Sequence, residues 1–276
     1  MGLTADQQAK LDDLRSNIRA LGRAAVAFSG GVDSAVLLKV CAEELAENTL
    51  AITARSGAAP PREIRAAQEF CHEEGIVQST VETHEFDLPG FNMNPPDRCY
   101  HCKREILSCI KREALAHGFE TIVEGSNADD ALDYRPGSKA VEEMSVRSPL
   151  RDANLPKGDV RAIAHELGLA VWDKPAFACL NTRFAYGEKI TPERLAMVDA
   201  VEEALLELGF TQVRARFAGD TVRIELPAED IPHAADPDTR TRITDACKQA
   251  GFTYASLDLN GYRTGSMNET LTAASE

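Results

Sequence analysis

A glycine-rich loop between an apolar segment and a helix limits the possible folds of this chain more than any other feature. Residues 24–28 (AAVAF) are uniformly apolar, which is typical of a strand buried on both faces of a parallel sheet. Residues 29–34 (SGGVDS) follow directly, and residues 35–45 have helical spacing. Glycines permit a tight turn close to a ligand, and a helix N-terminus attracts anions. The segment therefore predicts a phosphate-binding loop.

This loop differs from the Walker type because the Gly-Lys-Ser/Thr ending is absent. Without that lysine, we expect the loop to hold a pyrophosphate that departs, rather than to assist transfer of a terminal phosphoryl group. Hydroxyl, carboxylate and backbone groups of the loop are the expected nucleotide ligands, from Ser29, Gly30, Gly31, Asp33 and Ser34.

Strands and helices alternate through the first part of the chain. Apolar segments at 49–53, 80–86 and 121–123 predict further strands, and helices are expected at 61–74 and 99–117. This alternation predicts a doubly wound α/β fold with a parallel sheet. Ligands of such sheets bind beyond the carboxyl ends of strands, so Gly125 and Asn127, which follow 121–123, are also candidate nucleotide ligands.

The pattern changes towards the C-terminus. A helix is expected at 192–208, a hairpin from strands 213–217 and 221–226, a second helix at 239–250 and a strand at 254–259. This order predicts a smaller α+β domain with its own core. We therefore expect two domains, residues 1–185 and 186–276.

Composition restricts the possible partners. The chain has 30 Lys and Arg against 44 Asp and Glu, a net charge of −14, which argues against general nucleic-acid binding. No apolar run is long enough to span a membrane, and the first residues do not have the pattern of a secretory signal. We expect a cytoplasmic protein, and the odd number of cysteines, 7, agrees with a reducing compartment.

Three cysteines are candidate reactive or metal-binding groups. Cys99 and Cys102 lie three residues apart at the predicted start of a helix, where they share a face, and Cys179 lies far along the chain. A Cys-x-x-Cys pair alone is compatible with a redox pair, half of a zinc site or chance. Three thiolates on one cluster leave a position open, which suits a [4Fe–4S] cluster. The remaining four are expected to be buried: Cys41, Cys71, Cys109 and Cys247.

With the loop and the cysteines placed, the chain resembles the PP-loop ATP pyrophosphatases, which have an adenine nucleotide alpha hydrolase-like fold. It resembles more closely the ATP-dependent sacrificial sulfur transferases of the LarE type, which help to build the nickel-pincer nucleotide cofactor of lactate racemase. The resemblance covers nearly the whole chain and rests on segments 29–34, 124–137, 147–150, 159–161, 179–187, 213–217, 257–258 and 263–268.

The resemblance implies a reaction. ATP adenylates a carboxylate of pyridinium-3,5-biscarboxylic acid mononucleotide, with Mg²⁺ held by Asp33, and a sulfur nucleophile displaces AMP to leave a thiocarboxylate. In one branch of the family, the residue at the position of Cys179 gives up its own sulfur. Here Cys99 and Cys102 replace a tryptophan-containing stretch, so the chain is similar to the branch in which three cysteines hold a [4Fe–4S] cluster that supplies sulfide. The resemblance also implies a homo-oligomer, a trimer or hexamer.

Arginines of the C-terminal part are candidate ligands for the substrate's phosphate and carboxylates. Arg214 and Arg216 alternate along one predicted strand and share a face, and Arg183 follows Cys179 closely. Glu202, on the preceding helix, is expected to orient one of them. The alternative interpretation is an ordinary strand face with salt bridges.

Three other functions remain open. A tRNA-thiolating PP-loop enzyme also combines this loop with cysteines, but the acidic charge argues against it. An amide-forming PP-loop ligase needs an ammonia source, and residue 2 is Gly rather than the cysteine of a glutaminase. An iron–sulfur or zinc storage protein with a purely structural loop predicts no ATP binding.

Overall fold

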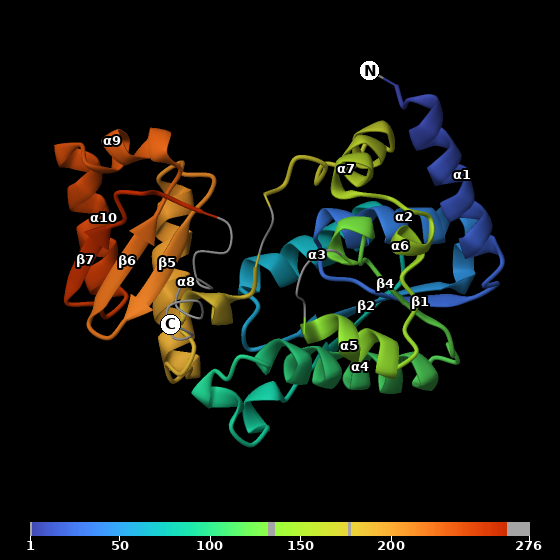
Figure 1. The fold of residues 1–276 in the computed structure, drawn as a ribbon, viewed down its shortest axis with the longest axis horizontal. Coiled ribbons are helices and arrows are strands. Elements are labelled where there is room, and N and C mark those ends of the chain that lie inside the picture. Colours follow the sequence, from blue (N-terminus) through green and yellow to red (C-terminus); the bar gives the residue numbers. More distant parts are fainter. Residues whose placement is uncertain (1, 132–135, 176–177, 264–276) are drawn as a thin grey trace, which may run out of the picture. The chain divides into compact units, whose positions relative to one another are not determined.

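Four parallel strands build the sheet that carries the glycine-rich loop (Figure 1). Their order across the sheet is β3 (Gln78–Glu82), β2 (Thr49–Arg55), β1 (Ala24–Ala27) and β4 (Ile122–Glu124). In this computed structural model Val26 of β1 lies opposite both Ala51 and Val123. The chain moves outward from β1 to β3 and returns on the other side of β1 for β4. The topological switch point, where such sheets bind ligands, is therefore between β1 and β4.

Helices cover both faces of the sheet (Figure 1). One apolar core combines β1 with α1 (Ala5–Arg19), α2 (Val32–Leu45), α3 (Pro61–Glu73), α6 (Pro149–Asp152) and α7 (Lys157–Glu166). A second core combines β1 and β2 with α4 (Arg98–Ala116) and α5 (Pro136–Glu143). The predicted doubly wound α/β fold is confirmed.

Local differences from the expected elements have local causes. Helix α2 begins at Val32 rather than at residue 35, because Gly31 is its N-cap and Asp33 and Ser34 form its first turn. Strand β3 ends at Glu82, because the following residues form a 3₁₀ turn, Glu85–Asp87. There the buried Glu85 accepts a hydrogen bond from Thr83 Oγ1 at 2.6 Å, so the segment turns inward instead of continuing as a strand.

A separate unit contains the C-terminal part, Leu88–Pro96 and Ala178 onwards. Its three-stranded sheet has the order β5 (Arg214–Ala218), β6 (Thr221–Glu225) and β7 (Tyr254–Leu257). β5 and β6 form the predicted antiparallel hairpin, and β7 runs parallel to β6. The helices are α8 (Pro192–Glu207), the short α9 (Ile231–Ala234) and α10 (Pro237–Gln249). Phe217 joins the core by stacking on Phe184, with the ring centres 5.1 Å apart. Its ring centre lies 5.8 Å from that of Phe252.

Two segments outside the expected C-terminal domain belong to this unit. The 3₁₀ turn Leu180–Arg183 is tied to α8 by the ion pair of Arg183 with Glu202. Asn94 of the 88–96 segment donates its side-chain amide to the carbonyls of Phe184 and Ala185, at 3.1 and 2.6 Å. The domain boundary after residue 185 stays a prediction.

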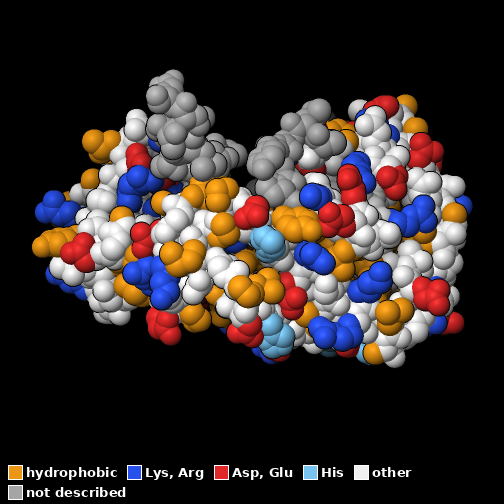
Figure 2. Space-filling view, turned by 60° about the horizontal axis from the view of Figure 1, so that its bottom comes forward, with side chains coloured by type: hydrophobic (Ala, Val, Ile, Leu, Met, Phe, Trp, Pro, Cys, Tyr) orange, Lys and Arg blue, Asp and Glu red, His pale blue; other side chains and the backbone are white. Residues whose placement is uncertain are grey.

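The structure describes residues 2–131, 136–175 and 178–263. Residues 132–135 and 264–268 of the family motifs lie outside these ranges. Within them, no helix is both long and apolar enough to cross a membrane. On the face shown in Figure 2, the Lys and Arg side chains of the described residues are interspersed with Asp and Glu and do not gather into one basic patch.

Candidate active site

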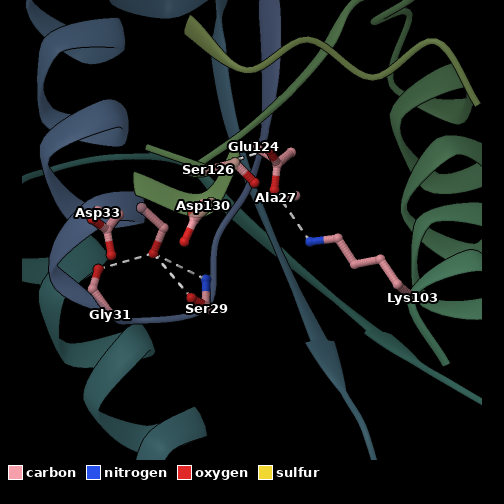
Figure 3. Close-up of a pocket in the computed structure, with 10 residues that line it drawn as sticks. Ala27, Ser29, Gly31, Asp33, Lys103, Glu124, Ser126 and Asp130 are labelled. Atoms are coloured by element: carbon pink, nitrogen blue, oxygen red, sulfur yellow. Dashed lines mark hydrogen bonds and ion pairs between the residues drawn. The ribbon is translucent and has the colours of Figure 1, made fainter. Parts of the chain in front are cut away.

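A cavity of about 240 Å³ lies at the switch point, beyond the carboxyl ends of β1 and β4 (Figure 3). Its lining comes from the glycine-rich loop, the first turn of α2, the segment after β4, and one side chain of α4: Ala27, Ser29, Gly31, Asp33, Ser34, Lys103, Glu124, Gly125, Ser126 and Asp130. The lining is mainly polar and includes backbone amides. Four of the five predicted loop residues, together with Gly125, line this cavity.

Ser34 holds the glycine-rich loop in shape. Its hydroxyl donates to the Gly31 carbonyl at 3.0 Å, accepts from the Ser29 amide at 3.3 Å, and lies 3.1 Å from the Ser29 hydroxyl. Gly30 has φ of +74°, a backbone conformation that favours glycine. Gly31 has no side chain to cap α2, so the first-turn amides are available to an anion. This arrangement can bind phosphate oxygens.

Gly125 lets the segment after β4 contact the start of α2. A Cβ placed on Gly125 would lie 2.9 Å from the Ser34 amide nitrogen and 3.1 Å from the Ser34 Cα. Backbone atoms cannot move aside as a flexible side chain can, so the close approach requires glycine here. The turn after β4 thereby fixes the phosphate loop.

Glu124 and Lys103 form an ion pair at the cavity wall that no sequence motif indicated. Lys103 Nζ lies 3.2 Å from Glu124 Oε2, and Glu124 Oε1 accepts from Ser148 Oγ at 2.6 Å and the Ser126 amide at 3.1 Å. Burial alone would raise the pKa of Glu124, but Lys103 and the serine donors hold this pKa below its usual value. Lys103 therefore brings a positive charge to a loop that has no Walker lysine.

Replacing Glu124 with glutamine is expected to lower the free energy of unfolding by about 1–3 kcal/mol at neutral pH, because charged hydrogen bonds are lost. The folded pKa of Glu124 is depressed, so its stabilisation is complete above the usual value of 4.5 and is lost as the pH falls through the folded pKa. Urea unfolding at several pH values measures this difference. Glu120→Gln, at an exposed position, is the control. If the wild type remains more stable than Glu124→Gln by the same free energy in acid, the depressed pKa of Glu124 is contradicted.

Asp33 is contacted from two directions. Lys157, the first residue of α7, forms an ion pair with Asp33 Oδ2, and Asn127 Nδ2 donates to Oδ1 at 3.0 Å. Lys174 donates to the Gly30 carbonyl at 3.3 Å and pairs with Glu63 at 2.7 Å. The predicted residues Asp33 and Asn127 are thus brought together, and the two lysines were not identified from the sequence.

The carboxylates at the cavity suit Mg²⁺, which binds proteins through one or two carboxylates together with phosphate oxygens. Asp33 and Asp130 both line the cavity and offer such oxygens (Figure 3). Within the described ranges, no group of at least three His, Cys, Asp or Glu residues forms a site that could hold a metal ion without a further ligand. A metal ion here would need the nucleotide's own oxygens.

Four guanidinium and carboxylate groups of the second unit form one buried network. Arg183 and Glu202, both almost inaccessible, make a two-pronged ion pair at 2.7 and 2.9 Å, so Glu202 orients Arg183. Arg183 also donates to the Cys179 carbonyl at 3.4 Å. Arg216 donates to the Thr182 carbonyl at 2.6 Å and pairs with Glu225 at 2.8 Å, which agrees with the salt-bridge alternative for that residue.

Arg214 is the arginine whose charge is least favoured. Burial and the nearby Arg183 hold the pKa of Arg214 below its usual value. Its guanidinium donates to the Val213 carbonyl at 2.7 Å and lies 5.1 Å from the centre of the Tyr262 ring. An anionic ligand would offset this desolvation, but a substrate role for Arg183, Arg214 and Arg216 stays a prediction.

Replacing Glu202 with glutamine is expected to destabilise the protein by about 3–5 kcal/mol, because Arg183 would be left buried without its counter-charge. The Ala215 amide, which donates to Glu202 Oε1 at 3.0 Å, would keep only a neutral acceptor in place of the carboxylate. Thermal and urea unfolding measure the effect, with the exposed Glu207→Gln on the same helix as control. Equal stability of the two variants would contradict a structural ion pair.

All seven cysteines lie in the described ranges, and none of them forms a disulfide there. Cys99 is exposed and Cys102 half-buried in the first turns of α4, and Cys179 is exposed just before Leu180. Cys99 and Cys102 belong to one unit and Cys179 to the other, so their convergence stays a prediction. The other four are buried as expected, and burial raises the pKa of Cys41 and Cys71 to about 12 and of Cys247 to about 11. Burial also raises the pKa of Cys109.

Sequence comparison decides the family. The pyridinium-3,5-bisthiocarboxylic acid mononucleotide synthase of Lactiplantibacillus plantarum is 39% identical over 259 residues, which cover 93% of each chain. The chain belongs to this LarE-type family of PP-loop ATP pyrophosphatases. An uncharacterized protein of Synechocystis sp. is 42% identical over 96% of this chain and 99% of its own length. One subunit of the glutamine-hydrolyzing GMP synthase of Thermoplasma volcanium is 23% identical over 70% of this chain and 65% of its own. No family model matches the sequence.

Family membership confirms the enzyme class predicted from the sequence: this LarE-type protein is an ATP-dependent sulfur-inserting enzyme. The cavity at the glycine-rich loop gives that class a physical basis, because Ser29 and Ser34, the first turn of α2 and Lys103 line one space that can receive phosphate groups. The source of the sulfur is a separate question.

Proposed function

We propose that this enzyme adenylates a carboxylate of pyridinium-3,5-biscarboxylic acid mononucleotide and replaces it with a thiocarboxylate, in the biosynthesis of the nickel-pincer nucleotide. The observation that carries the proposal is 39% identity, over 93% of the chain, to a synthase of the corresponding bisthiocarboxylic acid mononucleotide. The phosphate cavity at the switch point supports the use of ATP.

The chemistry requires activation before sulfur can enter. A carboxylate is a poor acyl donor, since its leaving group would be oxide. Attack of a carboxylate oxygen on the α-phosphorus of ATP releases pyrophosphate and turns the leaving group into AMP. A sulfur nucleophile then forms the C–S bond while the C–O bond to AMP breaks and AMP takes the electron pair. Covalent activation thus splits one difficult step into two.

The residues of the cavity have distinct roles in this proposal. Ser29, Ser34 and the first-turn amides of α2 bind phosphate oxygens, and Lys103 balances the charge that develops as pyrophosphate leaves. Asp33 holds Mg²⁺ on the phosphates. In the second unit, Arg183, which Glu202 orients, binds the anionic groups of the substrate together with Arg214 and Arg216.

We propose that Cys99, Cys102 and Cys179 hold a [4Fe–4S] cluster. The donor set fits, because all three are thiols outside disulfides, Cys99 and Cys179 exposed and Cys102 half-buried, and the first two lie one helical turn apart on α4. Bound there with one iron free of protein ligands, the cluster would supply sulfide to the acyl adenylate. The alternative is that Cys179 alone gives up its sulfur. Assembly as a trimer or hexamer and a cytoplasmic location stay predictions.

Product analysis tests the proposed function. Incubating the anaerobic protein with Mg-ATP and the biscarboxylic mononucleotide should give AMP, pyrophosphate and thiocarboxylate in equal amounts, without ammonia or tRNA. AMP release that requires ammonia would point instead to an amide ligase. Salt-sensitive tRNA binding would favour a tRNA-thiolating enzyme. No binding of Mg-ATP in calorimetry would favour a storage protein.

A further inference from the structure

Lys157 forms an ion pair with the Asp33 carboxylate, the group that is expected to bind the nucleotide's divalent cation. Its ammonium group pairs with Asp33 Oδ2, while Asn127 donates to Oδ1 at 3.0 Å. The pair is partly buried, with 22% of the Asp33 side chain and 33% of the Lys157 side chain exposed. Both oxygens of Asp33 therefore have partners within the chain.

The backbone of Lys157 is fixed, so only its side chain is able to exchange partners. Its amide donates to Asp129 Oδ2 at 2.8 Å at the start of α7. Further along α7, Val160 and Ile163 are fully buried in the core that also contains α2. The lysine thus has a rigid base next to the cavity and a flexible, partly exposed end.

We propose that Lys157 makes divalent-cation binding at Asp33 conditional on the nucleotide. Without a nucleotide, the ammonium charge repels a second cation from the carboxylate it neutralises. A polyphosphate offers the ammonium group new acceptors of higher charge, so Lys157 exchanges Asp33 for a phosphate oxygen and the carboxylate becomes available. Cation and nucleotide then enter together. This inference rests on the proposed use of ATP.

Mn²⁺ binding followed by electron paramagnetic resonance tests the inference without measuring turnover. The nucleotide-free wild type should bind Mn²⁺ at least about tenfold more weakly than Lys157→Met, the size expected when one partly buried ion pair is removed. Adding Asp33→Asn to Lys157→Met should abolish the gain in Mn²⁺ affinity. With a non-hydrolysable ATP analogue and Mn²⁺, Lys157→Met should bind the analogue about tenfold more weakly than the wild type, because the phosphate loses its contact with the Lys157 ammonium group.

Lys10→Met is the matched control, since it removes the 2.7 Å ion pair of Lys10, on α1, with Asp159, which lies on α7 as Lys157 does. This variant should change neither affinity. If Lys157→Met folds poorly, Lys157→Gln takes its place and should show the same changes in Mn²⁺ and analogue affinity. Equal Mn²⁺ affinity of the nucleotide-free wild type and Lys157→Met overturns the inference. If the wild type does not bind Mn²⁺ with nucleotide at all, both proposals fail. If the Mn²⁺ pattern holds but no thiocarboxylate forms, only the proposed function fails.

Discussion

Replacing Cys179 with alanine is expected to abolish thiocarboxylate formation, by more than about 100-fold, while ATP still yields acyl adenylate and pyrophosphate. The reason is that Cys179 takes part in sulfur delivery in both versions of the proposal, whereas the phosphate cavity belongs to the other unit and contains no cysteine. The measurement is pyrophosphate release in a single turnover, alongside mass spectrometry of the nucleotide product.

The matched variant Cys99→Ala separates the two sulfur sources. If three thiols hold a cluster, Cys99→Ala should lose both iron and thiocarboxylate formation. If Cys179 acts alone, Cys99→Ala should form thiocarboxylate at the wild-type level. Cys247→Ala, which removes a buried thiol, should behave as wild type apart from stability. Full activity of Cys179→Ala would contradict both versions.

Replacing Gly125 with alanine should reduce kcat/KM for ATP-dependent pyrophosphate release by about 100-fold, since misplacement of catalytic groups by about 1 Å has effects of this size. The added Cβ meets the backbone of Ser34 at 2.9 Å, so the start of α2 has to move away from the segment after β4. The first-turn amides that bind phosphate would move with it. Calorimetry with Mg-ATP should show a parallel loss of affinity.

Gly158→Ala is the control for Gly125→Ala. Gly158 lies in the first turn of α7, and a Cβ there has nothing within 4 Å. Its substitution should leave nucleotide affinity unchanged and stabilise the helix slightly. Circular dichroism establishes whether Gly125→Ala remains folded. A folded Gly125→Ala protein that binds Mg-ATP as tightly as wild type would show that the close approach is not needed for the phosphate loop.

The sequence predicted the parts of the site that local rules determine. An apolar run followed by a glycine-rich turn and a helix specifies a strand, a loop and an anion-binding helix end within about a dozen residues, so the phosphate loop was identified correctly. Glu202 was linked to an arginine because its helix directly precedes the strand that carries Arg214 and Arg216. The buried cysteines followed from apolar helical spacing.

The missed residues depend on contacts between distant segments. Lys103 follows the Cys-x-x-Cys pair on α4 and Lys157 begins α7, but neither position in the sequence indicates the contact that the lysine makes. Lys103 lines the cavity, and Lys157 pairs with Asp33, only because the fold brings distant segments together. The 88–96 segment joins the second unit through Asn94, a contact about 90 residues away in the sequence. Periodicity cannot reveal pairings of this kind.

One preparation of the protein tests the source of the sulfur. Protein purified without oxygen is assayed for iron and acid-labile sulfide, and the mass of Cys179 is measured before and after turnover. A [4Fe–4S] cluster as sulfur source predicts about four irons and four sulfides per chain and an unchanged Cys179 after product has formed. Iron-free protein in which Cys179 loses the mass of H₂S with each turnover would contradict it.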